Sequence, residues 1–256
     1  MTLRRYSVPM DSDEQFTVVD HAIDTLREAI RSGQFEPGSR LVIADIGKRL
    51  SISSGAVREA IRRLTGEGLV EIVPHRGASV RKVTGTDVAE IFELREAIEG
   101  LAARLAARRM DADGRARLRA ILADLDRHDV DDDAENYLIA NQAFHQLIYS
   151  IAANDRVRTL AMQLILPLYQ LRLPHRMAGD AREVAHLEHH AIAATLMVGD
   201  EDAAAAAMMR HIRSSGANLR AAVELLEAPR KRRRAPRSAP RQEDTPSPPK
   251  DDAQSD

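Results

Sequence analysis

The sequence predicts a mainly α-helical protein in which an N-terminal winged helix-turn-helix domain is followed by an all-α helical bundle. Two observations favour this fold class. Residues 43–82 contain two short helical patterns, a tight turn between them and two extended runs after them. Residues 86–227 contain long segments rich in Ala, Leu, Glu and Arg, with helical periodicity and short polar breaks.

The two short helices are predicted from the spacing of their apolar residues. Between them lies Ser51-Ile52-Ser53, a connection of the length that helix-turn-helix pairs use, and Ser53 can serve as the N-cap of the second helix. The apolar positions at helical intervals are Ile43, Ile46, Leu50, Val57, Ala60, Ile61 and Leu64. We therefore expect two amphipathic helices that pack against each other.

The face of the second helix away from this packing is basic. It carries Arg58, Arg62 and Arg63, which suit DNA phosphates or guanine edges, and Gly55 keeps its N-terminus slim enough for a close approach to DNA. For each arginine taken alone, a solvated helix face is an equally good interpretation. The order of helix, turn and basic helix is more specific than any single residue.

A short hairpin is expected after the second helix. Gly66 and Gly68 end the helix, and the turn at 74–77 contains His75, which taken alone could be an ordinary turn residue. The apolar residues that mark the two extended runs are Val70, Ile72, Val80 and Val83. This hairpin is the predicted wing.

Several motifs in residues 16–83 resemble the N-terminal domain of the GntR family of bacterial transcription regulators. They are Glu36-Pro37-Gly38-Ser39-Arg40-Leu41, Ser53 together with Val57-Arg58-Glu59-Ala60-Ile61, Arg63-Leu64, Glu67-Gly68-Leu69-Val70 and Arg76-Gly77-Ala78-Ser79-Val80. The resemblance implies that Arg58 reads a base, that Ser53 contacts a phosphate and that the wing tip enters the minor groove of double-stranded DNA. The chain departs from the usual pattern with Ser54 in place of a frequent arginine, and with Gly55-Ala56 in place of Thr-Pro. The predicted DNA-binding residues are Arg40, Ser53, Ser54, Gly55, Arg58, Arg62, Arg63, His75, Arg76 and Gly77.

The bundle is predicted from helical periodicity in six segments. They cover 86–109, 114–127, 134–153, 155–172, 181–198 and 200–227, with polar breaks at 129–133 and 177–180. Pro167 is expected to kink or split the fourth segment. The acidic residues between 124 and 133 lack the glycine turn and terminal Glu of an EF-hand, so we expect a solvated loop there.

Histidines supply the candidate chemistry of the bundle. Asn141 and His145 share one helix face, and His189 and His211 come from the fifth and sixth predicted helices. Three imidazoles in a common interior could hold a divalent metal with room for water or a ligand oxygen. Each histidine taken alone is better interpreted as an ordinary hydrogen-bonded or surface residue, and for His186 and His190 this interpretation is preferred.

The same region resembles the effector-binding FCD domain of the FadR subfamily. The motifs are Asn141 to Ile148, Ala153-Asn154, Glu188-His189, Gly199-Asp200, Ala203 to Ala207 and His211. In metal-binding members of the subfamily, an aspartate and three histidines hold zinc, nickel or a similar ion, and the effector is a small organic acid. The resemblance places His145, His189 and His211 on the histidine positions and the weaker, neutral ligand Asn141 on the aspartate position. We expect zinc first, with nickel and manganese as alternatives.

An anionic effector also needs cationic side chains, and Arg95 and Arg172 are the candidates. For Arg95 the alternative is an ordinary surface pair with Glu99, four residues further along the same helix.

Composition places few further limits on the chain. Its 256 residues include no cysteine, which excludes disulfides and thiolate metal sites. No apolar run approaches the roughly 18 residues that a membrane span needs, and no signal peptide opens the chain, so a cytoplasmic protein is expected. The formal charge is +2 for residues 1–83, −7 for 84–227 and +3 for 228–256. The predicted regions are a flexible N-terminus at 1–15, the winged domain at 16–83, the effector-binding and dimerisation bundle at 84–227 and a disordered basic tail at 228–256.

These observations predict a transcription regulator that binds a short inverted repeat as a homodimer. A small carboxylate would bind at the metal, shift the bundle between conformations and release the DNA, so repression is expected, with activation as the alternative. Two rival functions remain at this stage. One keeps the DNA-binding domain but gives the bundle a structural metal and no effector. The other is a zinc-dependent hydrolase, which an H-E-x-x-H motif would favour and which this sequence does not support.

Overall fold

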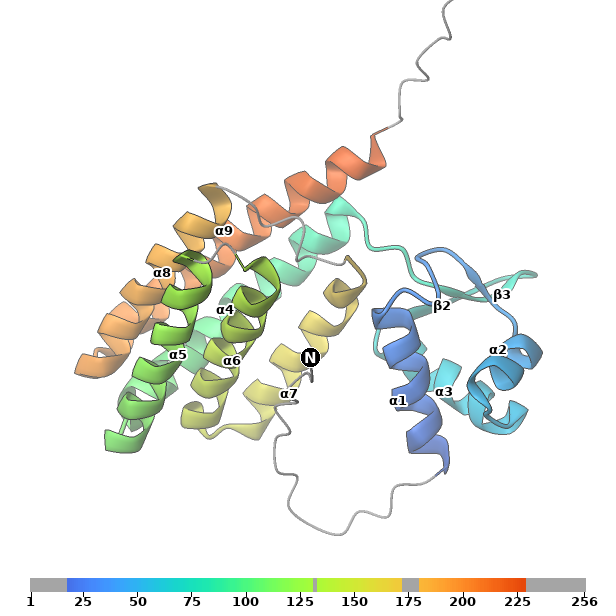
Figure 1. The fold of residues 1–256 in the computed structure, drawn as a ribbon, viewed down its shortest axis with the longest axis horizontal. Coiled ribbons are helices and arrows are strands. Elements are labelled where there is room, and N and C mark those ends of the chain that lie inside the picture. The colour runs from blue at the N-terminus through green and yellow to red at the C-terminus, as the bar shows by residue number, and fades with distance from the viewer. Residues whose placement is uncertain (1–17, 131–132, 172–179, 229–256) are drawn as a thin grey trace, which may run out of the picture.

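The computed structural model describes residues 18–130, 133–171 and 180–228. Within these ranges the chain forms two units with separate hydrophobic cores, a winged helix-turn-helix and a helical bundle. Figure 1 shows the winged unit, in blue and cyan, beside the bundle. The predicted mainly α-helical fold class is therefore confirmed. The expected flexible N-terminus and basic tail lie outside the described residues.

The winged unit contains three helices and a three-stranded sheet. The helix-turn-helix pair has the predicted bounds, and Ser53 caps the second helix by accepting a hydrogen bond from the Ala56 N–H at 3.2 Å. The elements are α1 Val18–Arg31, β1 Arg40–Leu41, α2 Ile43–Leu50, α3 Ser54–Gly66, β2 Val70–Val73 and β3 Gly77–Val80. The helix α1, which packs on α3, and the strand β1, which pairs with β3, were not individually predicted. The sheet is antiparallel with the order β1-β3-β2.

The turn between α2 and α3 depends on one close backbone approach. Ser51 adopts a left-handed conformation with φ of 57° and donates its backbone N–H to the carbonyl of Gly47. A Cβ atom at Gly47 would lie 2.8 Å from the carbonyl oxygen of Ile52. Glycine is therefore required here because of space rather than because of an unusual backbone angle.

The bundle consists of long helices that match the predicted segments closely. They are α4 Gly85–Arg109, α5 Ala112–Val130, α6 Ala134–Ala152, α7 Asp155–Ile165, the 3-10 helix η1 Leu166–Leu171, α8 Asp180–Val198 and α9 Glu201–Glu227. Pro167 splits the fourth predicted segment, as expected, because α7 gives way to a 3-10 helix there. No helix in the described ranges is both long and apolar enough to cross a membrane.

The structure corrects the prediction of a solvated acidic loop. Asp124, Asp126 and Asp129 belong to the last turns of α5, because the helix continues to Val130. Asp133 caps α6 by accepting the N–H of Asn136 at 3.1 Å. Residues 131–132 lie outside the described ranges.

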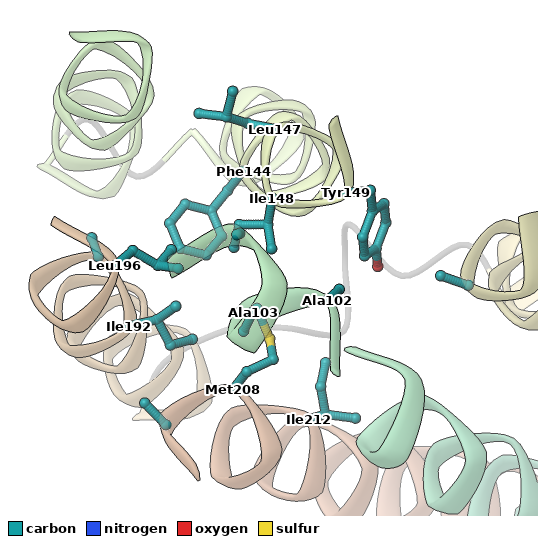
Figure 2. Close-up of a cluster of buried hydrophobic side chains, with 14 of the residues drawn as sticks. Ala102, Ala103, Phe144, Leu147, Ile148, Tyr149, Ile192, Leu196, Met208 and Ile212 are labelled. Atoms are coloured by element: carbon teal, nitrogen blue, oxygen red, sulfur yellow. The ribbon is translucent and has the colours of Figure 1, made fainter. Parts of the chain in front are cut away.

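The core of the bundle lies where α4, α6, α8 and α9 meet. Figure 2 shows aromatic and aliphatic side chains from α6 and α8 packed over the small residues of α4, with Met208 and Ile212 contributed by α9. The labelled residues are Ala102, Ala103, Phe144, Leu147, Ile148, Tyr149, Ile192, Leu196, Met208 and Ile212. Alanines on α4 allow α9 to pack closely along it, and burial of each large side chain contributes about 1.5–3 kcal/mol.

The wing is joined to α4 by a short and well-anchored connection. Thr84 and Asp87 form a capping box at the start of α4, and Asp87 also pairs with Arg81. Val83, three residues after β3 ends, is already part of the bundle core. The start of α4 is thus held against the segment that follows β3, rather than separated from the wing by a flexible linker.

Candidate functional site

The N-terminal half of α3 presents an open polar surface. Ser53, Ser54, Gly55 and Arg58 are all exposed, and a Cβ atom at Gly55 would meet no atom within 4 Å. Among the described residues no acidic side chain pairs with Arg58. Its guanidinium is therefore available to a base edge or a phosphate.

The two later arginines of α3 are differently placed. Arg62 and Arg63 are exposed, and both contact the carboxylate of Glu59, at 2.5 Å and 3.4 Å. The hydrogen bond and charge of Arg62, with those of Arg63, lower the pKa of Glu59 to about 2. Glu59 therefore competes with DNA for these two arginines, so Arg58 is the better candidate for base contact.

The wing offers the second part of the surface. His75, Arg76 and Gly77 are exposed at the tip of the β2–β3 hairpin, where His75 has φ of 61° and Gly77 has φ of 83°. Arg40 is exposed on β1, which pairs with β3. Every predicted DNA-contacting residue is thus accessible, while its role in binding stays a prediction.

Three histidines from three helices meet inside the bundle. His145 lies on α6, His189 on α8 and His211 on α9, with 6%, 0% and 3% of their surfaces exposed. One ligand nitrogen from each ring lies within 4.8 Å of the others. The ring centroids of His189 and His211 are 4.6 Å apart, and that of His145 is 5.4 Å from His211. The structure therefore brings the three predicted histidines together into a cluster that could hold a metal.

Each of these imidazoles has its Nδ1 atom close to an oxygen atom. His145 Nδ1 lies 2.8 Å from Glu99 Oε2, within ion-pair distance but without hydrogen-bond geometry. His211 Nδ1 lies 3.0 Å from Glu188 Oε2, and His189 Nδ1 lies 3.4 Å from the hydroxyl of Tyr137. The Nε2 atom of His189 is buried without a hydrogen-bond partner. The hydrogen bonds of His211 and His189 orient these two rings, and the Nε2 atom of His189 is available to coordinate a metal.

Burial keeps two of the imidazoles neutral. Burial, reinforced by the nearby His211 and His145, lowers the pKa of His189 well below its ordinary value. Burial also lowers the pKa of His211, although the hydrogen bond that His211 donates to Glu188 opposes the shift. Neutral imidazole is the form that binds metals, so these rings need not lose a proton before coordination.

Arg95 lies beside this cluster but is not free. Its side chain is buried, its Nε lies 2.7 Å from Glu99 Oε1, and its guanidinium lies over the ring of Phe92. Burial alone would raise the pKa of Glu99, yet the charges of Arg95 and His145 outweigh it and hold that pKa well below its usual range. The alternative of an ordinary surface pair is therefore wrong, because both partners are buried in the bundle. Arg172 lies outside the described residues.

The oxygen atoms that contact the three histidines were not predicted from the sequence as partners of these rings. Asn141 is half-buried on α6, one turn before His145, and its role as a ligand stays a prediction. Glu99 could have been found, because it lies in phase with the buried stripe of Phe92, Arg95 and Ala103 on α4. Glu188 entered the sequence analysis only within the Glu188-His189 motif, without a role, and no sequence signal identifies Tyr137.

The two units define a class of protein, a DNA-binding regulator in which a winged helix-turn-helix precedes a helical bundle. Comparison with known proteins makes this more specific. Residues 19–80 match the family described as "Bacterial regulatory proteins, gntR family", and residues 90–214 match the FCD domain. The chain belongs to the GntR family of bacterial transcription regulators and carries an FCD domain. It is thus a DNA-binding transcriptional regulator.

Individual relatives agree with this assignment. An HTH-type transcriptional regulator from the TAR-I ttuE-ttuC' intergenic region of Agrobacterium vitis is 34% identical over 144 residues, which cover 53% of this chain and 81% of that protein. The probable D-xylose utilization operon transcriptional repressor of Paenarthrobacter nicotinovorans is 27% identical over 202 residues, with 77% and 86% covered. A GntR regulator structure from Rhodococcus sp. RHA1 superposes with a TM-score of 0.60 at 26% identity, covering 83% and 99% of the two chains. The families and these relatives are transcriptional regulators rather than enzymes, as predicted.

Proposed function

We propose that this chain is a cytoplasmic repressor of the FadR subfamily that leaves its operator when a small carboxylate binds at a metal in the bundle. The observation that carries this proposal is the convergence of three buried imidazoles from three helices. The name of the Paenarthrobacter relative, a repressor, supports the sign of regulation. The proposed functional division lies at residues 83 and 84, with DNA binding in 16–83 and sensing and dimerisation in 84–227.

The histidine cluster fits a divalent metal. Three imidazole nitrogens suit zinc, with nickel or manganese as alternatives, and the orphaned Nε2 of His189 would gain a partner. Asn141 would add a neutral amide oxygen. When bound, the metal would supply a Lewis-acidic anchor for a carboxylate oxygen. Glu99, Glu188 and Tyr137 would orient the three rings through their Nδ1 atoms.

DNA binding is assigned to α3 and the wing. Arg58 would contact a base, Ser53 and Ser54 a phosphate near the exposed N-terminus of α3, and His75 to Gly77 the minor groove. Arg40, Arg62 and Arg63 would add phosphate contacts. Gly55 would let the backbone approach the DNA closely.

A homodimer would place two winged units on an inverted repeat. The exposed leucines of α4 support this assembly, because Leu94 and Leu101 lie seven residues apart on one helix face and are 57% and 42% exposed. A two-fold dimer presents one α3 to each half-site of a palindrome. Sedimentation of the full chain at micromolar concentration should therefore give twice the chain mass, and the double substitution of Leu94 and Leu101 by Ser should give the monomer.

The effect of ligand binding in the bundle would reach the winged units through α4. This helix carries Arg95 and Glu99 beside the histidine cluster, and it begins five residues after the wing's last strand ends. A carboxylate at the metal would compete with Glu99 for Arg95 and shift α4 between two packings. The two winged units would then change their spacing, which lowers affinity for the inverted repeat.

One observation favours a second candidate, a purely structural metal without an effector. The three imidazoles are at most 6% exposed, and the charge of Arg95 is already matched by Glu99. A closed site of this kind would stabilise the bundle permanently. The two candidates differ in whether a small acid stabilises the protein beyond the stabilisation that the metal alone provides.

The DNA-binding assignment is tested by replacing Arg58 with Ala. An operator is first selected from a random duplex library with the full chain. The loss of a bidentate base contact, worth about 1–3 kcal/mol, should then weaken operator binding by about 5-fold to 150-fold. The matched control is Arg119→Ala, which removes an exposed arginine from α5 and should leave binding unchanged. Unaltered specific binding by the Arg58 variant would overturn the assignment.

The effector is tested by thermal unfolding of the zinc-loaded and chelator-treated protein against sugar acids, hydroxy acids and dicarboxylates. A ligand at about a hundred times its dissociation constant stabilises by roughly 2.7 kcal/mol, which shifts the unfolding midpoint by several degrees. A shift that needs zinc and is absent in His189→Ala supports the proposal. A large loss of stability on chelation with no response to any acid supports the structural metal instead.

A further inference from the structure

A second group of metal-ligating side chains lies between α5 and α8, and its two histidines stand on either side of His189 in the sequence of α8. His186 and His190 are four residues apart on α8, and Asp126 faces them from α5. Their Nε2 atoms lie 3.2 Å and 2.7 Å from the same carboxylate oxygen, Oδ1 of Asp126. The two imidazole centroids are 4.9 Å apart.

The spacing of these donors is close to that of a metal site. Ligands about 2.1 Å from a tetrahedral zinc ion lie about 3.4 Å from one another. Each Nε2–Oδ1 distance differs from this value by less than an ångström, and all three ligand atoms lie within 4.8 Å of one another. Small side-chain rotations would therefore suffice, because histidines at i and i+4 already share one helix face.

The surroundings distinguish this group from the interior histidine cluster. The side chains of His190 and Asp126 are 42% and 49% exposed, so water can complete the coordination shell. Arg182, also on α8, pairs with Asp129 at 3.1 Å. The Nδ1 atom of His186 is buried without a hydrogen-bond partner. A carboxylate, two imidazoles and open positions together suit a borderline divalent cation.

We propose that Asp126, His186 and His190 form a second divalent-metal site, which binds zinc with water in the remaining positions. The proposed role goes beyond the preferred interpretation of His186 and His190 as ordinary hydrogen-bonded or surface residues, with which the hydrogen bond of His190 to Asp126 agrees. The ion would link α5 to α8. The site would thus fix α8 from outside the bundle, independently of whether the interior cluster binds a metal.

The stoichiometry of zinc binding tests the proposal. Isothermal titration of the full chain, treated with chelator and then dialysed, is expected to show two zinc ions for the wild type. His190→Ala should lose one ion, and His145→Ala should lose the other. The matched control is His21→Ala, an exposed histidine on α1, which should keep both. If His190→Ala binds one zinc ion fewer than the wild type while His145→Ala binds as many as the wild type, the result supports this site and contradicts the interior one. Zinc binding that is the same in wild type and His190→Ala overturns the proposal.

Amide hydrogen exchange is a second measurement. A zinc-dependent change in its rate would not be expected if Asp126 only formed ion pairs with the two histidines. Zinc should slow amide exchange in the last turns of α5 in the wild type and in His145→Ala, because the ion ties Asp126 to α8. The same protection should be absent in Asp126→Asn, which keeps the shape of the side chain but removes its charge. Equal protection of α5 by zinc in Asp126→Asn would contradict the proposed ligand set.

Discussion

Helices α3 and α4 carry glutamate–arginine pairs of the same spacing in opposite environments. On α3, Glu59 binds Arg62 and Arg63 at the surface of the winged unit. On α4, Arg95 and Glu99 are four residues apart and have only 11% and 0% of their side chains exposed. Spacing therefore predicts that a pair forms, whereas the phase of the pair relative to the apolar stripe decides whether it is buried. Burial in turn decides how much the pair matters for stability.

The strongest test of this comparison is Glu99→Ala in chelator-treated protein. Removing one partner of a buried pair leaves Arg95 uncompensated in the interior, which costs about 3–5 kcal/mol of unfolding free energy. Urea denaturation should show this loss. The matched change on α3, Glu59→Ala, should leave the denaturation midpoint unaltered because water solvates both arginines. Similar losses for the two variants would show that burial is not the deciding factor.

A second test concerns the winged unit, whose stability depends on backbone geometry. Gly47→Ala would place a Cβ atom 2.8 Å from the Ile52 carbonyl oxygen, so α2 and the turn must shift. The expected cost is about 1–3 kcal/mol, measured by urea denaturation. Gly66→Ala, at the end of α3, meets no atom within 4 Å and should be neutral or stabilising by up to about 1 kcal/mol. A neutral Gly47→Ala would mean that the turn can relax.

The third test uses pH and separates buried from exposed histidines. The pKa values of His189 and His211 are lowered in the folded protein, so below pH 6.5 the unfolded chain binds protons that the folded chain does not. Stability of the metal-free protein should therefore fall as the pH falls from 7.5 to 5.5, by at most about 1.4 kcal/mol per pH unit for each such histidine. The lowered pKa of Glu99 does not contribute here, because its effect is lost only in more acidic solution.

His189→Gln should flatten this pH dependence, while His21→Gln, on the exposed face of α1, should not change it. Urea denaturation at intervals of half a pH unit measures both slopes. An unchanged slope in His189→Gln would indicate that other groups cause the loss of stability in acid.

Much of the fold could be predicted from the sequence because the helices have strong periodicity and clear end signals. The bounds of α2 and α3 follow from Ser53 and the glycines after α3, and the break after α7 follows from Pro167. The strand β1 was missed because two residues are too short for a periodic signal. The three interior histidines were found, but their oxygen partners were not, because Tyr137 and Glu188 reach them only through the packing of separate helices.

The pairing of Asp126 with His186 and His190 illustrates the same limit. The three residues are spread over 64 positions of the chain, and only the packing of α5 against α8 brings them together. Acidic residues at the end of α5 therefore appeared to belong to a loop. Local sequence patterns predict helices and strands, but the packing of these elements against one another decides which side chains form a site.

Because the first turn of α4 is anchored to the wing, a small tilt of this helix would displace the wing by a larger distance. The capping box and the Arg81–Asp87 pair fix its first turn to the wing, and Glu99 lies fourteen residues further along. At 1.5 Å per residue this separation is about 21 Å, so a tilt of about 5° around Glu99 would displace the wing's attachment by about 2 Å. Such a displacement is comparable to a hydrogen-bond length. A sub-ångström adjustment around the histidines could thus be magnified, without unfolding any element, into the loss of contacts to a base.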